Sequence, residues 1–236
     1  MSSPIAASNH NAIKGLLVSV HQKLSHRHRI ELISEKISSL INRHAPAAET
    51  IRCLDVGCGD MEIAERVGEA DKRTIWCCID VHALPEQLET DAKWGKYRQF
   101  DGEHIPFSSQ SMDVVLLCDV LHHAGSHAIK LLKEAARVGK VVIVKDHFEY
   151  SWYSRTVLQL MDFLGNWGYG IQIPDRYFTV KGFADISKAA GLQVADLEIG
   201  IDLYSHHAVF KPILRSEWQF IAVLNSDMRS MLIKEG

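Results

Sequence analysis

The chain has 236 residues, of which 47% are hydrophobic and 23% are charged, and 26 Lys and Arg against 29 Asp and Glu give a net charge of −3. This composition is typical of a globular protein and excludes disordered, collagen-like and disulfide-scaffold proteins. The near balance of charge gives no electrostatic reason to expect a nucleic acid or an anionic membrane surface as the main partner.

The first 50 residues are predicted to form helices. From Ser25 onwards apolar residues recur at helical spacing, and Pro46 indicates that this helix ends near His44. An earlier helix is predicted from Ile13 to Leu24. The N-terminus has no basic segment before its apolar part, and no apolar run approaches the ~20 residues that span a bilayer. We therefore expect a cytoplasmic protein without a signal peptide or a membrane span.

Beyond residue 50, short apolar runs alternate with helical stretches. The predicted strands are Ile51–Val56, Thr74–Ile79, Tyr97–Phe100, Met112–Cys118, Lys140–Lys145, Gln193–Ile199 and Trp218–Leu224. The predicted helices among them are Met61–Val67, Pro85–Lys93, Ser126–Val138 and Val180–Ala190. Apolar strands separated by helices predict an α/β fold, with a doubly wound, mostly parallel sheet that is covered on both faces.

The pattern predicts a single domain of 236 residues with four parts. The N-terminal helices occupy residues 1–49, and a cofactor-binding half occupies residues 50–150. An inserted cap follows in residues 151–178, where the alternation is interrupted, and the C-terminal part of the sheet occupies residues 179–236.

A Gly-x-Gly turn follows the first predicted strand, in the segment Leu54-Asp-Val-Gly-Cys-Gly-Asp60. Gly57 and Gly59 permit a sharp turn and a close approach of a ligand to the backbone. A dinucleotide fingerprint needs a third Gly where this chain has Glu62, whose carboxylate would repel a pyrophosphate. S-adenosylmethionine has no phosphate and carries positive charge, so the acidic surroundings of the turn favour it.

Acidic residues also follow the next predicted strands. Asp80 lies about 20 residues beyond the Gly turn, where a carboxylate can accept hydrogen bonds from both ribose hydroxyls. Asp101 precedes Gly102 after the third strand and is placed to accept a hydrogen bond from the adenine amino group. Asp119 follows the fourth strand. Ligands of open α/β sheets bind outside the carboxyl ends of the strands, so a cofactor is expected there.

These motifs resemble the class I S-adenosylmethionine-dependent methyltransferases, close to the small-molecule subgroup known as methyltransferase type 11. The segments LDVGCGD, FDGEHIPF and SMDVVLLCDVLHH carry the likeness, together with Asp80. The resemblance implies a Rossmann-like seven-stranded sheet whose last strand is antiparallel. One departure is Asp60-Met61, where the family often has another Gly. The residues expected to bind the cofactor are Asp55, Gly57, Cys58, Gly59, Asp80, Val81, Asp101, Gly102 and Asp119.

Histidines after the fourth and fifth strands are the candidate catalytic bases. A hydroxyl or carbon-acid acceptor must lose a proton, and His is the common base. We rank His147 first and His122 second, with His206 and His207 in reserve. A metal-assisted reaction, with the side chains of Asp119, Asp146 and His147 as ligands of Mg²⁺ or Mn²⁺, is a less favoured alternative, and the expected site has no metal.

The predicted cap is rich in aromatic residues that could line an acceptor pocket. The residues expected to bind the acceptor are His123, Asp146, Trp167, Tyr169 and Tyr177. The alternative is an ordinary amphipathic helix in which Val157, Leu160, Met161 and Leu164 pack on the core, and both descriptions can hold together.

The sequence therefore predicts an S-adenosylmethionine-dependent methyltransferase that acts on a small molecule, with oxygen as the favoured position. Methylation of a small metabolite at nitrogen or carbon is an alternative, and so is a catalytically idle methyltransferase-fold subunit that serves assembly. A nucleic-acid acceptor is disfavoured, because Cys118-Asp-Val-Leu121 stands where DNA amine methyltransferases have an Asn/Asp-Pro-Pro-aromatic motif. No oligomeric state is predicted.

Overall fold

Seven strands form one sheet in the computed structural model, which describes residues 26–84, 92–165, 173–204 and 213–226. The sheet order is β3-β2-β1-β4-β5-β7-β6. Neighbouring strands pair in parallel from β3 to β5, whereas β7 pairs antiparallel with both β5 and β6. This arrangement confirms the predicted Rossmann-like sheet with an antiparallel last strand. The strands are β1 (Ile51–Val56), β2 (Thr74–Asp80), β3 (Tyr97–Gln99), β4 (Met112–Cys118), β5 (Gly139–His147), β6 (Leu192–Ile199) and β7 (Gln219–Ser226).

Helices follow most of the parallel strands. A helix over residues 26–44 precedes the sheet, as predicted, and the predicted helix Ile13–Leu24 lies outside the described residues. Of the predicted helix Pro85–Lys93, the structure describes only residues 92 and 93, which begin a 3₁₀ helix. The other helices are α2 (Glu62–Ala70), η2 (Ala92–Lys96), η3 (Leu121–His127), α3 (Ala128–Val138), α4 (Trp152–Gly165), α5 (Val180–Ala189) and η4 (Ser216–Trp218).

The start of α3 differs from the prediction. The helix begins at Ala128 rather than at Ser126, because η3 occupies the preceding residues. Gly125 has a φ of 51° within η3 and separates the two helical segments. The short η3 turn therefore carries the two adjacent histidines, which the sequence pattern had placed before a longer helix.

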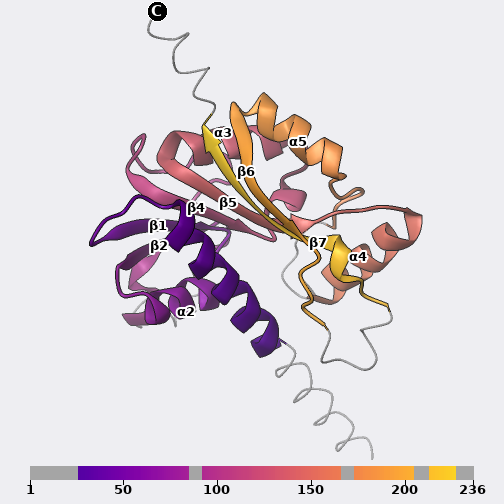
Figure 1. Ribbon diagram of the computed structural model, residues 1–236, viewed down its shortest axis with the longest axis horizontal. Helices are drawn as coiled ribbons and strands as arrows, with labels where there is room; N and C mark the ends of the chain where they lie inside the picture. The colour runs from indigo at the N-terminus through magenta and orange to yellow at the C-terminus, as the bar shows by residue number, and fades with distance from the viewer. Residues whose placement is uncertain (1–25, 85–91, 166–172, 205–212, 227–236) are drawn as a thin grey trace, which may run out of the picture.

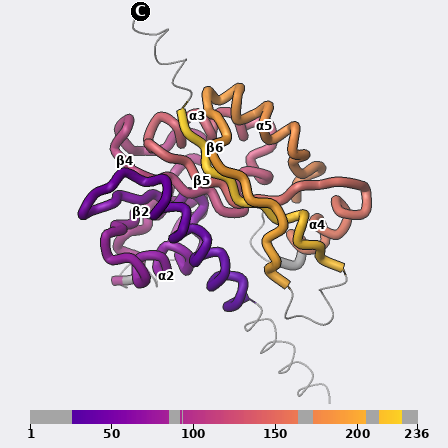
Figure 2. The backbone as a smooth tube through the Cα atoms, in the orientation of Figure 1, coloured from indigo at the N-terminus to yellow at the C-terminus, as the bar shows by residue number. Residues whose placement is uncertain are grey.

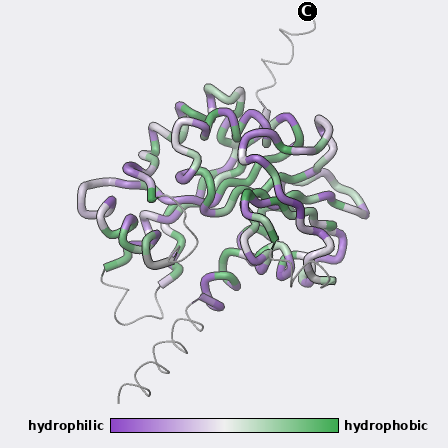
Figure 3. Tube along the Cα trace, turned by 180° about the vertical axis from the view of Figure 1, so that it is seen from behind, coloured by the Kyte–Doolittle hydropathy of each residue, from purple (hydrophilic) through white to green (hydrophobic). Residues whose placement is uncertain are grey.

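Both faces of the central strands are buried because these strands direct apolar side chains alternately to the two sides. In β4, Val114 and Leu116 pack in the same cluster as the N-terminal helix and α2. Val115 and Leu117 pack on the opposite face, in the cluster that includes α3 and α5. Figures 1 and 2 show these helix pairs on the two sides of the sheet, and Figure 3 shows the apolar central strands between them.

The cap lies beyond the edge of the sheet at which β7 begins (Figure 1). Its helix α4 packs through Leu158, with Val157 and Met161 at the margin of a cluster that also contains Tyr177. The prediction that Leu160 packs on the core is wrong, since its side chain is 55% exposed. Leu158 is buried instead. It lies three residues before Met161 and shares a helix face with it, whereas Leu160, two residues after Leu158, lies on another face. The side chain of Leu164 lies outside the described residues.

Among the helices that fall within the described ranges, none has the length and apolar content needed to cross a bilayer.

The N-terminal helix is part of the core, and truncation of its central residue is expected to destabilise the fold. Ile37 is fully buried between this helix and the sheet. Ile37→Ala should lower the free energy of unfolding by about 2–5 kcal/mol in urea denaturation, because it leaves a cavity. Ser39→Ala, at an exposed position of the same helix, should change it by less than ~0.5 kcal/mol. Equal effects of the two variants would contradict this packing.

Candidate functional site

The carboxyl ends of four parallel strands meet at one edge of the sheet. The register aligns Val56 of β1 with Ile79 of β2, and Leu117 of β4 with Val144 of β5. The order of connection reverses between β1 and β4, and such a switch point is the usual position of a ligand crevice in open α/β sheets. The Gly turn, Asp80, Asp119 and Asp146 lie at or just beyond these ends, as the sequence predicts.

The Gly turn after β1 is attached to the end of β2. The amide of Gly57 donates to the carbonyl of Ile79 at 2.8 Å, and the amide of Gly59 donates to Asp80 Oδ2 at 3.0 Å. Both glycines have a positive φ, of 71° and 51°. A Cβ at Gly57 would lie 2.4 Å from Val120 Cγ2, whereas a Cβ at Gly59 would meet no atom within 4 Å. Packing therefore requires Gly57, while the space beside Gly59 is open to a ligand.

Met61 occupies the position at which the sequence departs from the family pattern. Its φ of 64° is in the left-handed region, which glycine adopts with little cost and other residues rarely adopt. Its amide donates to the carbonyl of Cys58 at 2.8 Å, and its side chain is fully buried. The turn thus keeps a glycine-like conformation without the glycine, and burial of the Met side chain offsets the backbone cost.

Three carboxylates surround the turn. Asp55 and Asp80 are buried, and Asp60 is exposed. Burial and, to a lesser degree, the neighbouring charges of Asp80 and Asp60 together raise the pKa of Asp55 to about 7. Asp80 Oδ1 also accepts from the amide of His82 at 3.1 Å and lies 2.8 Å from its ring Nδ1. The carboxylates in this part of the site favour a cationic ligand.

The predicted adenine-side residues lie next to β2 and β3. Asp101 accepts hydrogen bonds from the amides of Glu103 and His104, at 2.8 and 2.7 Å, and these bonds lower the pKa of its carboxyl. Gly102 has a φ of 81°, and a Cβ there would lie 3.1 Å from Val81 Cγ1. Val81 is 48% exposed, so Val81 and Gly102 together leave an apolar surface beside Asp101.

Asp119 lies in a network of partly buried charges at the end of β4. Its Oδ1 is 2.6 Å from Nζ of Lys145, and its Oδ2 accepts from the Arg29 guanidinium. Lys145 is fully buried and also donates to Gln219 Oε1 at 2.8 Å. Burial opposes ionisation of Asp119, but Lys145, His147 and Arg29 outweigh it and hold the pKa of its carboxyl well below the usual range. The Asp119 carboxylate therefore faces protein cations at the position where the sequence predicts a cofactor contact.

Sequence reasoning did not identify Arg29 or Lys145. The signal for Lys145 is its place in an otherwise apolar strand, because a buried Lys requires a charged or polar partner. No local pattern marks Arg29, which is 90 residues from Asp119 in the chain.

The side chain of His122 is held by Asp146. Its Nδ1 lies 2.7 Å from Asp146 Oδ1, and its backbone amide donates to Asp146 Oδ2 at 3.1 Å. Both residues are buried. Burial alone lowers the pKa of His122, but the charges of Asp146 and Asp162 outweigh it and raise the pKa to about 10. At neutral pH, His122 is therefore a cation between two carboxylates.

His147 is in a different electrostatic environment. Burial and the charge of Lys145 lower the pKa of its imidazole, although Asp119 and Asp146 act in the opposite direction. Its amide donates to Asp146 Oδ1 at 2.7 Å, and its ring centroid is 5.4 Å from that of His122. Of the two predicted bases, His147 is thus the one whose pKa is lowered, and its imidazole is the better placed to accept a proton.

Tyr177 brings the cap to the histidines. Its ring centroid is 5.4 Å from that of His122 and 6.2 Å from that of His147, and its hydroxyl donates to Asp162 of α4. The half-buried ring of His123 lies against His122, with their centroids 3.9 Å apart. The structure therefore assembles these predicted acceptor-side residues. Trp167, Tyr169, His206 and His207 lie outside the described residues.

Glu149 connects the two described parts of the cap, and sequence reasoning did not identify it. Its buried carboxylate accepts from Arg155 of α4 at 3.0 Å, from Arg176 at 2.7 Å and from the amide of Tyr177 at 3.0 Å. Burial opposes ionisation, but the hydrogen bonds from these groups lower the pKa of Glu149. Glu149 thereby orients Tyr177 toward the site.

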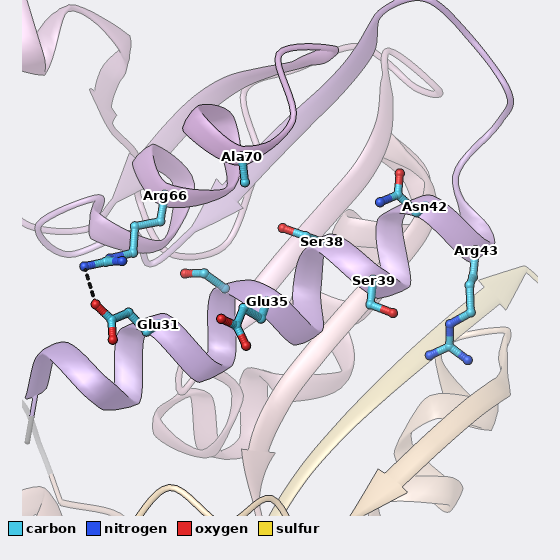
Figure 4. A pocket seen from close by; sticks show the side chains of 9 residues that line it. Glu31, Glu35, Ser38, Ser39, Asn42, Arg43, Arg66 and Ala70 are labelled. Atoms are coloured by element: carbon cyan, nitrogen blue, oxygen red, sulfur yellow. Dashed lines mark ion pairs between the residues drawn. The ribbon is translucent and has the colours of Figure 1, made fainter.

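A separate polar groove of about 600 Å³ lies between the N-terminal helix and α2. Figure 4 shows Glu31 and Arg66 paired across one end of it, at 3.2 Å. None of its lining residues is a predicted site residue, and the chemistry assembled at the carboxyl ends of the strands is absent from its walls. Those lining residues are Glu31, Ser34, Glu35, Ser38, Ser39, Asn42, Arg43, Arg66 and Ala70.

Comparisons with known proteins agree with this geometry. Residues 54–141 match the family model described as a methyltransferase domain. A crystal structure of an S-adenosylmethionine-dependent methyltransferase from Aquifex aeolicus has a TM-score of 0.54 and 17% identity, covering 87% of this chain and 96% of that one. No curated protein matches the sequence significantly.

Two other similar structures have different named activities. The mitomycin 7-O-methyltransferase MmcR has a TM-score of 0.55 and 16% identity, covering 84% of this chain and 54% of that one. The [4+2]-cyclase SpnF also has a TM-score of 0.55 and 16% identity, covering 81% of this chain and 80% of that one. At such identities the likeness establishes the fold, and the reaction has to be argued from the site.

The family match, the strand order and the acidic Gly turn at the β1–β4 switch point lead to one assignment. Residues 54–141 match a methyltransferase domain, and the described chain has the fold of S-adenosylmethionine-dependent methyltransferases.

Proposed function

We propose that this protein transfers the methyl group of S-adenosylmethionine to a small-molecule acceptor, with oxygen as the favoured position. The observation that carries the proposal is the Gly turn, which is open at Gly59 and lies against the buried carboxylates of Asp55 and Asp80. A cationic sulfonium and amino group would be attracted to this negative charge, and a pyrophosphate would be repelled.

Each part of the cofactor has proposed contacts. The methionine portion would lie along Asp55 and the backbone of Gly57, Cys58 and Gly59, and the ribose hydroxyls would donate to Asp80. Adenine would lie against Val81 and Gly102, with its amino group at Asp101. The cofactor would contact Asp119 through its backbone, because the Asp119 side chain pairs with Arg29 and Lys145.

Methyl transfer needs an acceptor oxygen in line with the carbon–sulfur bond. When bound, S-adenosylmethionine would supply an activated methyl group and leave as the neutral thioether, and His147 would take the hydroxyl proton of the acceptor. His147 suits this role because burial and the charge of Lys145 lower the pKa of its imidazole, and its ring lies beside those of His122 and Tyr177. Tyr177 and His123 would form the described part of the pocket wall, and Asp146 would hold His122 in place.

The choice of oxygen has support from the similar structure that is named an O-methyltransferase. The [4+2]-cyclase is as similar to this chain as the O-methyltransferase is, so the same fold is also compatible with a reaction other than O-methylation. A product with the label on nitrogen or carbon would replace the oxygen assignment. Cofactor binding without any labelled product would favour a catalytically idle subunit.

Loss of the Asp80 charge is expected to weaken cofactor binding. Asp80→Asn retains an oxygen that can accept from the Gly59 amide but removes the charged acceptor of the ribose hydroxyls. Calorimetric titration with S-adenosylmethionine should show a Kd raised about 10-fold or more, because a charge-assisted hydrogen bond is worth about 1.5–3 kcal/mol. Asp185→Asn, at an exposed residue of α5, is the matched control and should bind normally. An unchanged Kd for Asp80→Asn would contradict the ribose assignment.

Asp55 should make cofactor binding depend on pH. Its pKa of about 7 in the free protein means that the carboxylate forms as the pH rises through neutrality, and a nearby cation favours that ionised form. The affinity should therefore increase about 10-fold between about pH 6 and about pH 8, relative to Asp55→Asn in the same buffers. The same change of affinity with pH in the wild type and in Asp55→Asn would contradict this prediction, because it would show that only the ligand titrates.

The same pKa shift predicts an effect on stability. Because folding raises the pKa of Asp55, its contribution to stability is full below its ordinary pKa near 4 and is lost as the pH rises through about 7. Asp55→Asn should accordingly stabilise the cofactor-free protein in thermal denaturation at about pH 8, and should have little benefit at about pH 4. Destabilisation by this substitution at the higher pH would contradict the shift.

Removal of the proposed base should reduce turnover while cofactor binding persists. With methyl-labelled S-adenosylmethionine and an extract of small metabolites, mass spectrometry should find a labelled product for the wild-type protein. His147→Gln should lower its rate of formation about 100-fold or more, with the Kd of the cofactor unchanged. His127→Gln, at an exposed residue of η3, should retain full activity. Equal rates for His147→Gln and wild type would exclude His147 as the base.

A further inference from the structure

We propose that His122, His123 and Asp162 bind one divalent transition-metal ion between η3 and the cap. Each of the three side chains offers a ligand atom, and these atoms all lie within 4.8 Å of one another. Two imidazoles and one carboxylate are ligands that Zn²⁺ and related first-row ions share, and three protein ligands leave positions open for water or substrate.

A buried ring nitrogen of His122 faces Asp162 of the cap. The side chain of His122 is 1% exposed, and its Nε2 has no hydrogen-bond partner within the described part of the chain. Asp162 Oδ2 lies 3.3 Å away, yet no hydrogen bond forms between the two atoms. Two ligands of one tetrahedral ion at bond lengths of 2.0–2.1 Å are separated by about 3.4 Å, and their lone pairs converge on the ion rather than on each other. The observed pair has this separation.

Two of the three ligands, His122 and Asp162, are held by a further side chain. Asp146 contacts Nδ1 of His122 at 2.7 Å, which leaves Nε2 as the free ligand atom and fixes the plane of the ring. The Tyr177 hydroxyl donates to Asp162 and restrains its carboxylate. A carboxylate behind a ligating His, and a hydrogen bond to a ligating carboxylate, are the usual outer contacts of metal sites.

Neighbouring groups explain why this set is preferred to two others. The possible ligand atoms of His122, Asp146 and His147 also lie within 4.8 Å of one another. An ion bound to them would have to displace the hydrogen bond between His122 and Asp146. The set of Asp119, Asp146 and His147, considered from the sequence, is disfavoured because Asp119 already pairs with Arg29 and Lys145. An ion on Nε2 would instead take the place of the proton that makes His122 cationic.

The position of the site suggests a class of substrate, and this part of the inference rests on the proposed methyl transfer. An ion beside His147 and Tyr177 would hold an oxygen of the acceptor and increase the acidity of its hydroxyl, so that His147 removes the proton more easily. The acceptors it favours are small molecules whose hydroxyl oxygen can occupy the fourth, open position of the ion.

Metal titration in the absence of cofactor tests the site. Zn²⁺ added to the chelator-treated full-length protein should bind with a stoichiometry of one and a Kd of about 1 μM or lower by calorimetry. His123→Ala and Asp162→Asn should each raise that Kd about 10-fold or more, and Asp146→Asn should raise it about 10- to 100-fold. Co²⁺ should give visible absorption bands that are lost in the same variants. Circular dichroism checks that each variant is folded.

His26→Ala is the matched control. His26 belongs to an exposed cluster with Asp60 and Glu62 that could also hold an ion, and its loss should leave the high-affinity binding intact. Absence of Zn²⁺ and Co²⁺ binding up to about 1 mM would overturn the proposal. Binding that is lost in His26→Ala but retained in both His123→Ala and Asp162→Asn would overturn it as well.

Titration of S-adenosylmethionine into the same samples separates this inference from the proposed function. Binding of the cofactor without binding of metal removes the metal site alone. Binding of metal without binding of the cofactor removes the proposed methyl transfer and leaves the metal site in place.

Discussion

The ion pair between Lys145 and Asp119 is the interaction on which the arrangement of the site depends. Lys145 is fully buried in β5, and a buried ammonium is tolerated only when partners compensate its charge. Asp119 and Gln219 supply that compensation, at 2.6 and 2.8 Å from Nζ. Asp119 also pairs with Arg29 of the N-terminal helix. The buried charge of Lys145 therefore connects this helix with β4, β5 and β7 at the edge where the ligands are expected.

This network divides the site into two electrostatic halves. On the acceptor side, burial and Lys145 lower the pKa of His147, while Asp146 and Asp162 raise the pKa of the neighbouring His122. On the cofactor side, the carboxylates of Asp55 and Asp80 face the open Gly turn and repel one another. The free protein thus stores unfavourable electrostatic energy at the place where a cationic ligand would relieve it.

Much of the fold could be predicted because strand signals are local. The strands at residues 51–56 and 112–118 begin and end as predicted, since their apolar runs are continuous and end in a turn or an acidic residue. Local patterns were less informative where tertiary contacts decide. The start of α3 depends on Gly125, and Leu160 is exposed because the cap packs through Leu158 instead.

The sequence by itself determined the sheet, its covered faces and the acidic Gly turn, because apolar periodicity and glycine content are properties of short segments. Only the tertiary structure decided which charges meet. His122 and Asp146 are 24 residues apart, Lys145 and Asp119 are 26 apart, and Arg29 and Asp119 are 90 apart. Such pairs form only when the strand ends and the N-terminal helix pack together, and burial then sets their protonation. The chemical difference between the two candidate bases therefore arises from the fold.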